Sequence, residues 1–289
     1  MLEGGKHYYL SGYLTSDVAT DGYIKASSST PACLHLNGHN ITATATSAIF
    51  ATGKLNVMGE GTVSGTGTPD ASYAAHRGAA VDLDNAAAVV NLYGGNYTKP
   101  ASISKVVVNV FRNGGTMNLF DGVTIDISSH AKGSCVRSFY GPVNIYGGTY
   151  VGTGNAATVH AYNWSTTKSG TVRVFGGNIS GAYQGVGGSG QVNGRGTVEI
   201  YGGTISNVRF SSYVNVIIGG DPVIRHLSVG SGGILTLGQL TEGASIKADA
   251  SGVFTNPSAN AAAYLEKGYI TAYNAEKAVT VVENALSCN

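Results

Sequence analysis

The sequence predicts an all-β protein, a single-stranded right-handed parallel β-helix of about nine to ten coils with irregular caps. Three observations predict this fold: a short motif recurs, each copy alternates apolar and polar residues, and helix signals are nearly absent. Each copy reads apolar, polar, apolar, aromatic, and then Gly-Gly, or Asp-Gly in one case. The clear copies are 90–95, 117–122, 143–148, 172–177 and 198–203.

The repeat length selects among the repeat folds. The clear copies begin 26 to 29 residues apart, and looser copies lie at 34–38, 55–59, 216–220 and 234–238. Alternation with period two places the first and third residues of each copy in the core, and the glycines permit a sharp corner. A propeller blade needs about 40–50 residues, and a leucine-rich repeat would add helical segments. Right-handedness follows from the general preference of parallel connections.

The whole chain, 1–289, is predicted to be one domain, because stacked repeats bury one continuous core. We expect the coils to occupy residues 31–249. An open stack leaves strand edges unpaired, so both ends need covering. Residues 1–30 are expected to form an N-terminal cap or irregular first coil. Residues 250–289 are expected to form a closing segment with one short helix over 258–267.

Composition excludes several classes of protein. Lys and Arg number 17 and Asp and Glu 16, so no basic field attracts nucleic acid. No apolar run reaches the roughly 18–20 residues of a membrane span, so we expect no membrane insertion. Cys33, Cys135 and Cys288 are odd in number and widely spaced, which favours neither a zinc site nor a disulfide framework. We expect a monomer.

The beginning of the chain bears on its location. Residues 1–6 lack the apolar segment of a signal peptide. The chain is therefore either cytoplasmic or a mature or excised piece of a secreted protein. Its 43 glycines, 17 tyrosines and only 11% charged residues favour the second alternative.

Several segments resemble bacterial cell-surface β-helix proteins of the pectate-lyase-like superfamily. Residues 34–41 resemble their leucine-asparagine-glycine-hydrophobic coil, the Gly-Gly-Thr/Asn-Ile/Tyr units resemble their central coils, and 252–255 with 263–265 resemble their closing segment. The resemblance covers roughly residues 5–285 and implies the fold and a secreted or cell-surface bacterial origin. The superfamily includes lyases, hydrolases, phage tailspikes and adhesins, so it does not select an activity. No catalytic motif of its pectate lyases or polygalacturonases is found here.

A polar and aromatic stripe is predicted on the outward side of the strands that precede the repeats. If these strands stack, four successive coils contribute to it, over roughly 15 Å. Such a surface suits sugars, because aromatic faces stack on pyranose rings while carboxylates and guanidinium groups bind hydroxyls. The members are Asp82 and Asp84; Asn109, Phe111 and Arg112; Arg137, Phe139 and Tyr140; and His160, Tyr162 and Trp164.

Asp82 and Asp84 are the candidate catalytic pair. Two outward carboxylates at i and i+2 lie roughly 6.5–7 Å apart, near the low end of the ~6.5–9.5 Å of inverting glycosidases. Arg137 and His160 are candidates for tuning these carboxylates or for binding a charged sugar. In a lyase, Arg137 or His160 would remove a proton while the two aspartates held Ca²⁺; otherwise no cofactor or metal is expected. The alternative is that all four are solvated surface groups.

Four other members of the stripe are candidates for substrate binding. Aromatic rings and a guanidinium group at these positions would hold the sugar against the coil face. They are Arg112, Tyr140, Tyr162 and Trp164.

Two further columns are predicted beside the glycine corners. Tyr93, Phe120, Tyr146, Phe175 and Tyr201 form an aromatic ladder. We favour a structural role, in which stacked rings stabilise the coils, over a carbohydrate-binding strip. The neighbouring column contains Asn91, Asn118 and Asn144, followed by Arg173 and Glu199. Its asparagines are expected to exchange amide hydrogen bonds, and Arg173 to pair with Glu199.

Three functions remain open. The first is an extracellular bacterial module that binds a polysaccharide or glycan, or acts as an adhesin or stalk. The second is a polysaccharide-degrading enzyme, a glycoside hydrolase rather than a lyase, that uses the acidic and aromatic stripe. The third is a mechanical spacer with neither activity. The regular scaffold and the missing catalytic signature favour the module.

Overall fold

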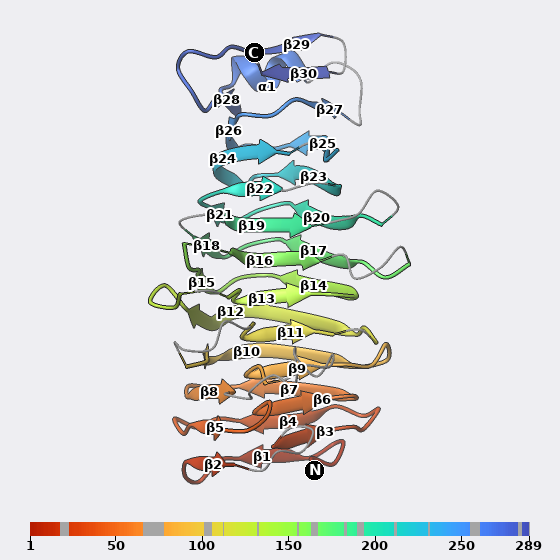
Figure 1. Cartoon of the computed structure of the whole chain (residues 1–289), viewed down its shortest axis with the longest axis vertical. Helices are drawn as coiled ribbons and strands as arrows, with labels where there is room; N and C mark the ends of the chain where they lie inside the picture. Colours follow the sequence, from red (N-terminus) through yellow and green to blue (C-terminus); the bar gives the residue numbers. More distant parts are fainter. Residues whose placement is uncertain are drawn as a thin grey trace.

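A computed structural model shows the chain as an all-β parallel solenoid with almost no helix (Figure 1). It describes residues 1–17, 23–65, 78–100, 106–111, 113–131, 133–154, 156–162, 167–181, 184–189, 194–210, 213–230, 232–254, 261–282 and 285–288. About eight turns, from β1 to β22, have three faces. Two-stranded turns then extend the stack toward the C-terminus. The parallel β-helix that the repeats predict is confirmed.

The first face carries the repeated motif. Its strands pair in parallel and in register from each turn to the next, so equivalent residues form columns along the axis. The strands are β1 (His7–Tyr9), β4 (Ala32–His35), β7 (Lys54–Met58), the first part of β10 (Val89–Thr98), the first part of β12 (Thr116–Asp126), β14 (Gly141–Ile145), β17 (Gly170–Val174), β20 (Gly196–Ile200), β23 (Val214–Gly220), β25 (Ile234–Leu240) and β27 (Gly252–Phe254).

The second face follows the glycine corner and is also parallel throughout. In two turns the chain passes the corner without leaving the strand, so β10 and β12 contribute to both faces. The other strands are β2 (Leu14–Ser16), β5 (Ile41–Ala43), β8 (Thr62–Gly65), β15 (Thr149–Val151), β18 (Asn178–Ser180), β21 (Thr204–Ile205), the first part of β24 (Val223–Val229), β26 (Ser245–Ala248) and β28 (Ile270–Ala272).

The third face contains the strands that precede each motif. It ends where the turns become two-stranded, because β24 there serves both the second and third faces. The strands are β3 (Ile24–Ala26), β6 (Ile49–Ala51), β9 (Val81–Leu83), β11 (Val108–Val110), β13 (Val136–Ser138), β16 (Ala157–Tyr162), β19 (Gln184–Ser189), β22 (Val208–Phe210) and the second part of β24.

Each glycine of the Gly-Gly corner is required for a different reason. A Cβ on Gly176 would collide with the carbonyl oxygen of Tyr146 in the preceding turn. Gly177 has a φ of 90°, in the left-handed region that favours glycine. Where a tyrosine follows the corner, its side chain turns inward, and the Tyr150 hydroxyl donates a 2.9 Å hydrogen bond to Gly147 O. The motif is therefore a requirement of the scaffold.

The two ends differ. Residues 1–30 contain a first turn, one of the two alternatives expected there, and its strands β1, β2 and β3 pair in register with β4, β5 and β6. At the C-terminus, β29 (Val279–Val282) and β30 (Ala285–Cys288) form an antiparallel hairpin that pairs with β27. The short helix α1 (Ala261–Glu266) lies within the predicted range. The parallel stack continues past 249, to β28.

Candidate functional site

The predicted stripe does stack on the third face. Asp82 of β9 pairs with Asn109 of β11. Asn109 in turn pairs with Arg137 of β13, which pairs with His160 of β16. Figure 1 shows these four strands at successive levels of the solenoid. The predicted stacking is confirmed, and we call these four residues the third-face column.

Asp82 is buried, contrary to the expectation that it faces solvent. Its side chain is 1% exposed. The carboxylate accepts hydrogen bonds from Ser47 Oγ, from Asn109 Nδ2 at 2.9 Å, and from the backbone N–H groups of Gly78 and Ala79. Burial raises the pKa of Asp82 above its ordinary value, while these hydrogen bonds oppose the rise.

Asp84 has a different role from Asp82. The strand β9 ends at Leu83, so Asp84 lies beyond the regular alternation on which the expected pairing depends. Its Oδ1 accepts a 2.8 Å hydrogen bond from the backbone N–H of Asn113 in the next turn. The expected pair of solvent-facing carboxylates is therefore wrong, because Asp82 is buried among side-chain and backbone donors and Asp84 forms a hydrogen bond to the next turn.

Arg137 and His160 are half-buried neighbours in the third-face column. Burial lowers the pKa of Arg137 to about 10. Burial, and then the nearby guanidinium, lower the pKa of His160 to about 3. His160 is therefore a neutral and weakly basic imidazole at pH 7. Such a group is a poor choice for the general base of a lyase.

Aromatic rings flank this pair. The Arg137 guanidinium carbon lies 5.6 Å from the Phe139 ring centroid and 5.9 Å from that of Tyr162. Tyr140 is 37% exposed, with the Lys168 ammonium 5.3 Å from its ring centroid. Tyr162 therefore lies close to Arg137, as a member of the predicted stripe should, and Tyr140 has a partly exposed ring. Arg112 and Trp164, the other two candidates for substrate binding, lie outside the described residues.

The aromatic ladder on the first face has the predicted stacking. Successive ring centroids lie 4.5, 5.1, 5.1 and 5.6 Å apart, with interplanar angles of 10° to 18°. Neighbouring rings therefore cover one another's faces, and the ladder mainly presents ring edges. Sugars stack on ring faces, so this geometry favours the structural interpretation.

The asparagine column has the predicted amide bonds. Asn91, Asn118 and Asn144 each donate to the oxygen of the preceding asparagine, at 2.7 to 2.8 Å, and the series begins one turn earlier, at Asn56. In the next turn, Arg173 Nε lies 3.2 Å from Oε1 of Glu199, one turn further on, which confirms that predicted ion pair.

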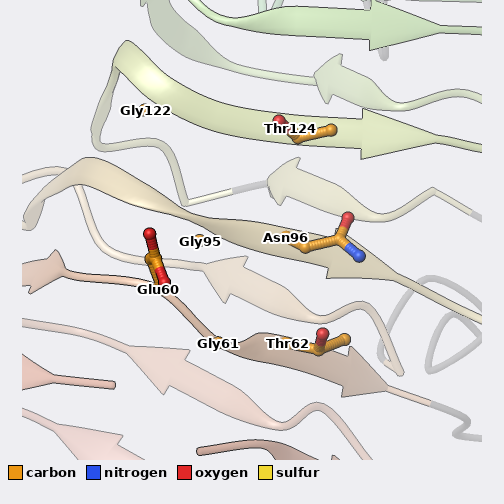
Figure 2. Close-up of a pocket in the computed structure, with 7 residues that line it drawn as sticks. All are labelled: Glu60, Gly61, Thr62, Gly95, Asn96, Gly122 and Thr124. Carbon is orange, nitrogen blue, oxygen red and sulfur yellow. The ribbon is translucent and has the colours of Figure 1, made fainter. Parts of the chain in front are cut away.

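A hollow of about 260 Å³ lies on the second face, away from the predicted stripe (Figure 2). It spans three turns at the glycine corner. Gly61, Gly95 and Gly122 line it without side chains. Its remaining lining consists of one carboxylate, one amide and two hydroxyls: Glu60, Asn96, Thr62 and Thr124.

Three of the residues that line the hollow are the first members of a longer polar column. Register along the second face aligns short polar residues in six successive turns: Thr62, Asn96, Thr124, Thr149, Asn178 and Thr204. Four of the six are exposed. Sequence reasoning treated the Thr/Asn step after each Gly-Gly pair only as the start of a strand. Its recurrence directly after the corner was the signal that could have identified this column.

Other classes of site are not found in the described part of the chain. These residues contain no group of three or more His, Cys, Asp or Glu that could hold a metal ion. The three cysteines are free. No helix among the described residues is long and apolar enough to cross a membrane. Comparisons with family models, curated proteins and solved structures found no match.

Proposed function

We propose that this chain is a carbohydrate-binding module, and that the hollow on the second face is its binding site. The observation that carries the proposal is the hollow itself, whose side chains are all polar and whose remaining lining is the backbone of three glycines. A sugar hydroxyl both donates and accepts hydrogen bonds. The lining offers a carboxylate acceptor, an amide that does both, and two hydroxyls that do both.

The position of the hollow favours an extended ligand. Turns of a parallel solenoid are about 4.8 Å apart, so the aligned residues of the second face repeat at a constant interval. Asn96 and Thr124 lie on adjacent turns inside the hollow, and Thr149 continues the column beyond it. A glycan chain lying along the solenoid axis would meet the same polar chemistry at every turn.

Several observations favour binding over hydrolysis. The hollow contains one carboxylate, Glu60, whereas most glycosidases need two that flank the bond. On the third face, Asp82 is enclosed and fully engaged in hydrogen bonds. A polysaccharide-degrading enzyme using Asp82 and Asp84 is therefore the less favoured alternative.

The proposal includes a location. We place the module outside a bacterial cell, as part of an adhesin or a stalk. This part rests on the resemblance of residues 34–41 and of the Gly-Gly units to cell-surface β-helix proteins.

The test is binding to a panel of plant and mucosal glycans by wild type and two matched variants. Asn96→Ala removes an amide from the hollow. Asn178→Ala removes the same side chain from the same column, three turns away and outside the hollow. We expect about tenfold weaker binding for Asn96→Ala, the equivalent of one good polar contact. For Asn178→Ala we expect a much smaller loss, and only with glycans long enough to extend along the column beyond the hollow. Equal affinities in all three proteins would place the site elsewhere.

The same panel tests the enzymatic alternative when it is read for new reducing ends. Glu60→Gln keeps the shape of the hollow and removes its carboxylate, and Asp84→Asn does the same on the third face. We expect no cleavage by wild type. Cleavage that disappears in either variant would overturn the assignment of this chain as a binding module.

A further inference from the structure

Arg137 has fewer partners than a half-buried guanidinium requires. Its Nε atom is buried and has no hydrogen-bond partner among the described residues. Within that part of the chain, the side chain makes one hydrogen bond, from Nη2 to Ser134 Oγ at 3.5 Å, the long end of the range. A guanidinium carries five N–H donors, so most of its capacity is unused.

No carboxylate compensates this charge among the described residues. The ion pairs found there join Lys6 with Glu3, Arg173 with Glu199, and Asp249 with both His226 and Lys277. The acidic member of the third-face column, Asp82, pairs with Asn109 and so lies two turns from Arg137. Arg173 provides the contrast, since it also projects from the solenoid but has a carboxylate one turn away.

The other ionisable groups beside Arg137 add no negative charge. Lys99 is 3% exposed, and burial, with a smaller contribution from Arg137, lowers its pKa to about 8. His160 is neutral, and the guanidinium contributes to the depression of its pKa. Burying a cation is unfavourable unless it is paired. Among the described residues, therefore, none around this cluster supplies the negative charge that would balance it.

We propose that Arg137 forms the centre of an oxyanion-binding site on the third face, which takes a carboxylate or sulfate group. The planar guanidinium fork matches two oxygens of such a group, and because Nε is buried, the two Nη groups would make that bidentate pairing. The Phe139 and Tyr162 rings pack against each other, with centroids 4.8 Å apart, and the guanidinium lies beside both of them. This site is separate from the hollow on the second face and goes beyond the function proposed for it.

The competing explanation is that Arg137 serves only to pack against the two rings. The two explanations predict opposite effects of Arg137→Met, which keeps an apolar side chain of similar length and removes the charge. A packing role based on cation–π contact predicts a lower thermal midpoint. An unpaired charge predicts an equal or higher midpoint in anion-poor buffer, because the variant no longer buries an uncompensated cation.

The experiment measures thermal midpoints of wild type, Arg137→Met and Arg173→Met in anion-poor buffer, then with millimolar sodium sulfate or sodium glucuronate at matched ionic strength. Sulfate stabilises most proteins by exclusion from their surface, and the variants measure that general effect. We expect wild type and Arg173→Met to rise by several degrees, and Arg137→Met to rise by less than one degree. A rise with one anion only would identify the preferred group.

A second measurement is the NMR spectrum of the His160 ring, because His160 is the register partner of Arg137. Addition of sulfate is expected to shift the ring resonances of His160 in wild type and to leave them unchanged in Arg137→Met. Equal midpoint rises in all three proteins, or a sulfate-induced His160 shift that persists in Arg137→Met, would overturn the proposal. A lowered midpoint of Arg137→Met in anion-poor buffer would assign the residue to packing instead.

Discussion

At the scale of single residues, Asp82 shows how an outward strand position becomes an interior one. Its carboxylate receives four hydrogen bonds, from Ser47, Asn109, and the backbone of Gly78 and Ala79. Every one of these partners is a donor. A carboxylate can accept all four, whereas an amide offers only one accepting oxygen. The site therefore discriminates between Asp and Asn despite their equal size.

We predict that Asp82→Asn lowers the free energy of unfolding by about 2 kcal/mol, because the new amide nitrogen faces buried N–H donors that lose their acceptor. Asp84→Asn is the matched control. It alters a hydrogen bond at an exposed turn, so the expected loss is under about 1 kcal/mol. Urea unfolding followed by circular dichroism measures both. Equal losses in the two variants would contradict the assignment of Asp82 as a buried structural acceptor.

His160 predicts a pH dependence of stability. Its pKa is about 3 in the folded protein and 6.5 in its ordinary state, so between these values the unfolded chain binds more protons. Stability therefore falls as pH decreases from 6.5 toward 3, through this residue. We predict that His160→Gln loses less stability than wild type over that interval. Urea midpoints at pH 7, 6, 5 and 4 provide the test, and parallel profiles would contradict it.

At the scale of elements, the columns of the first face are continuous ladders. A residue in the middle of the asparagine column makes more side-chain hydrogen bonds than the residue at its end. Asn118 both donates to Asn91 and accepts from Asn144. Asn144 donates to Asn118, and its own oxygen is buried without a hydrogen-bond partner. The strands they join are already paired through their backbones. The side chains therefore contribute to stability and register rather than to the existence of the sheet.

We predict that Asn118→Ala costs about 1–3 kcal/mol, because it breaks two side-chain bonds worth about 0.5–1.5 kcal/mol each and leaves two partners unpaired. Asn144→Ala breaks one such bond and removes an unsatisfied oxygen, so its cost is expected to be smaller. Denaturant midpoints of the two variants give the comparison. A larger loss for Asn144→Ala would show that the ladder does not act through its hydrogen bonds.

At the scale of the whole molecule, the sequence predicted the fold and the columns, but not which outward side chains are exposed or where the hollow lies. Alternation and corner glycines act within one repeat, so they specify the strands and the column to which each residue belongs. Whether Asp82 meets solvent depends instead on Gly78 and Ala79, which come from the chain leading into β9 and carry no periodic signal. The hollow likewise is lined by residues from three turns, among them Gly61, Gly95 and Gly122, which come together only after stacking.

The two ends of the stack are protected unequally. In the described part of the chain, β1 pairs only with β4 and β2 only with β5, whereas β27 lies between β25 and the antiparallel β30. A solenoid resembles a one-dimensional array in which each turn is stabilised by its neighbours. We therefore predict that backbone amides exchange fastest in β1 and β2, more slowly in β27, and slowest in central strands such as β17, as measured by hydrogen–deuterium exchange.

A variant at the C-terminal closure separates this explanation from simple distance to a terminus. Leu286 in β30 is 1% exposed, whereas Val282 in the neighbouring β29 is 68% exposed. Leu286→Asp places a charge in the core and should detach the hairpin, so exchange in β27 should rise to the rate of β1 while β17 remains protected. Val282→Asp should change neither. Protection of β27 that survives the loss of β30 pairing would show that the hairpin does not close the stack.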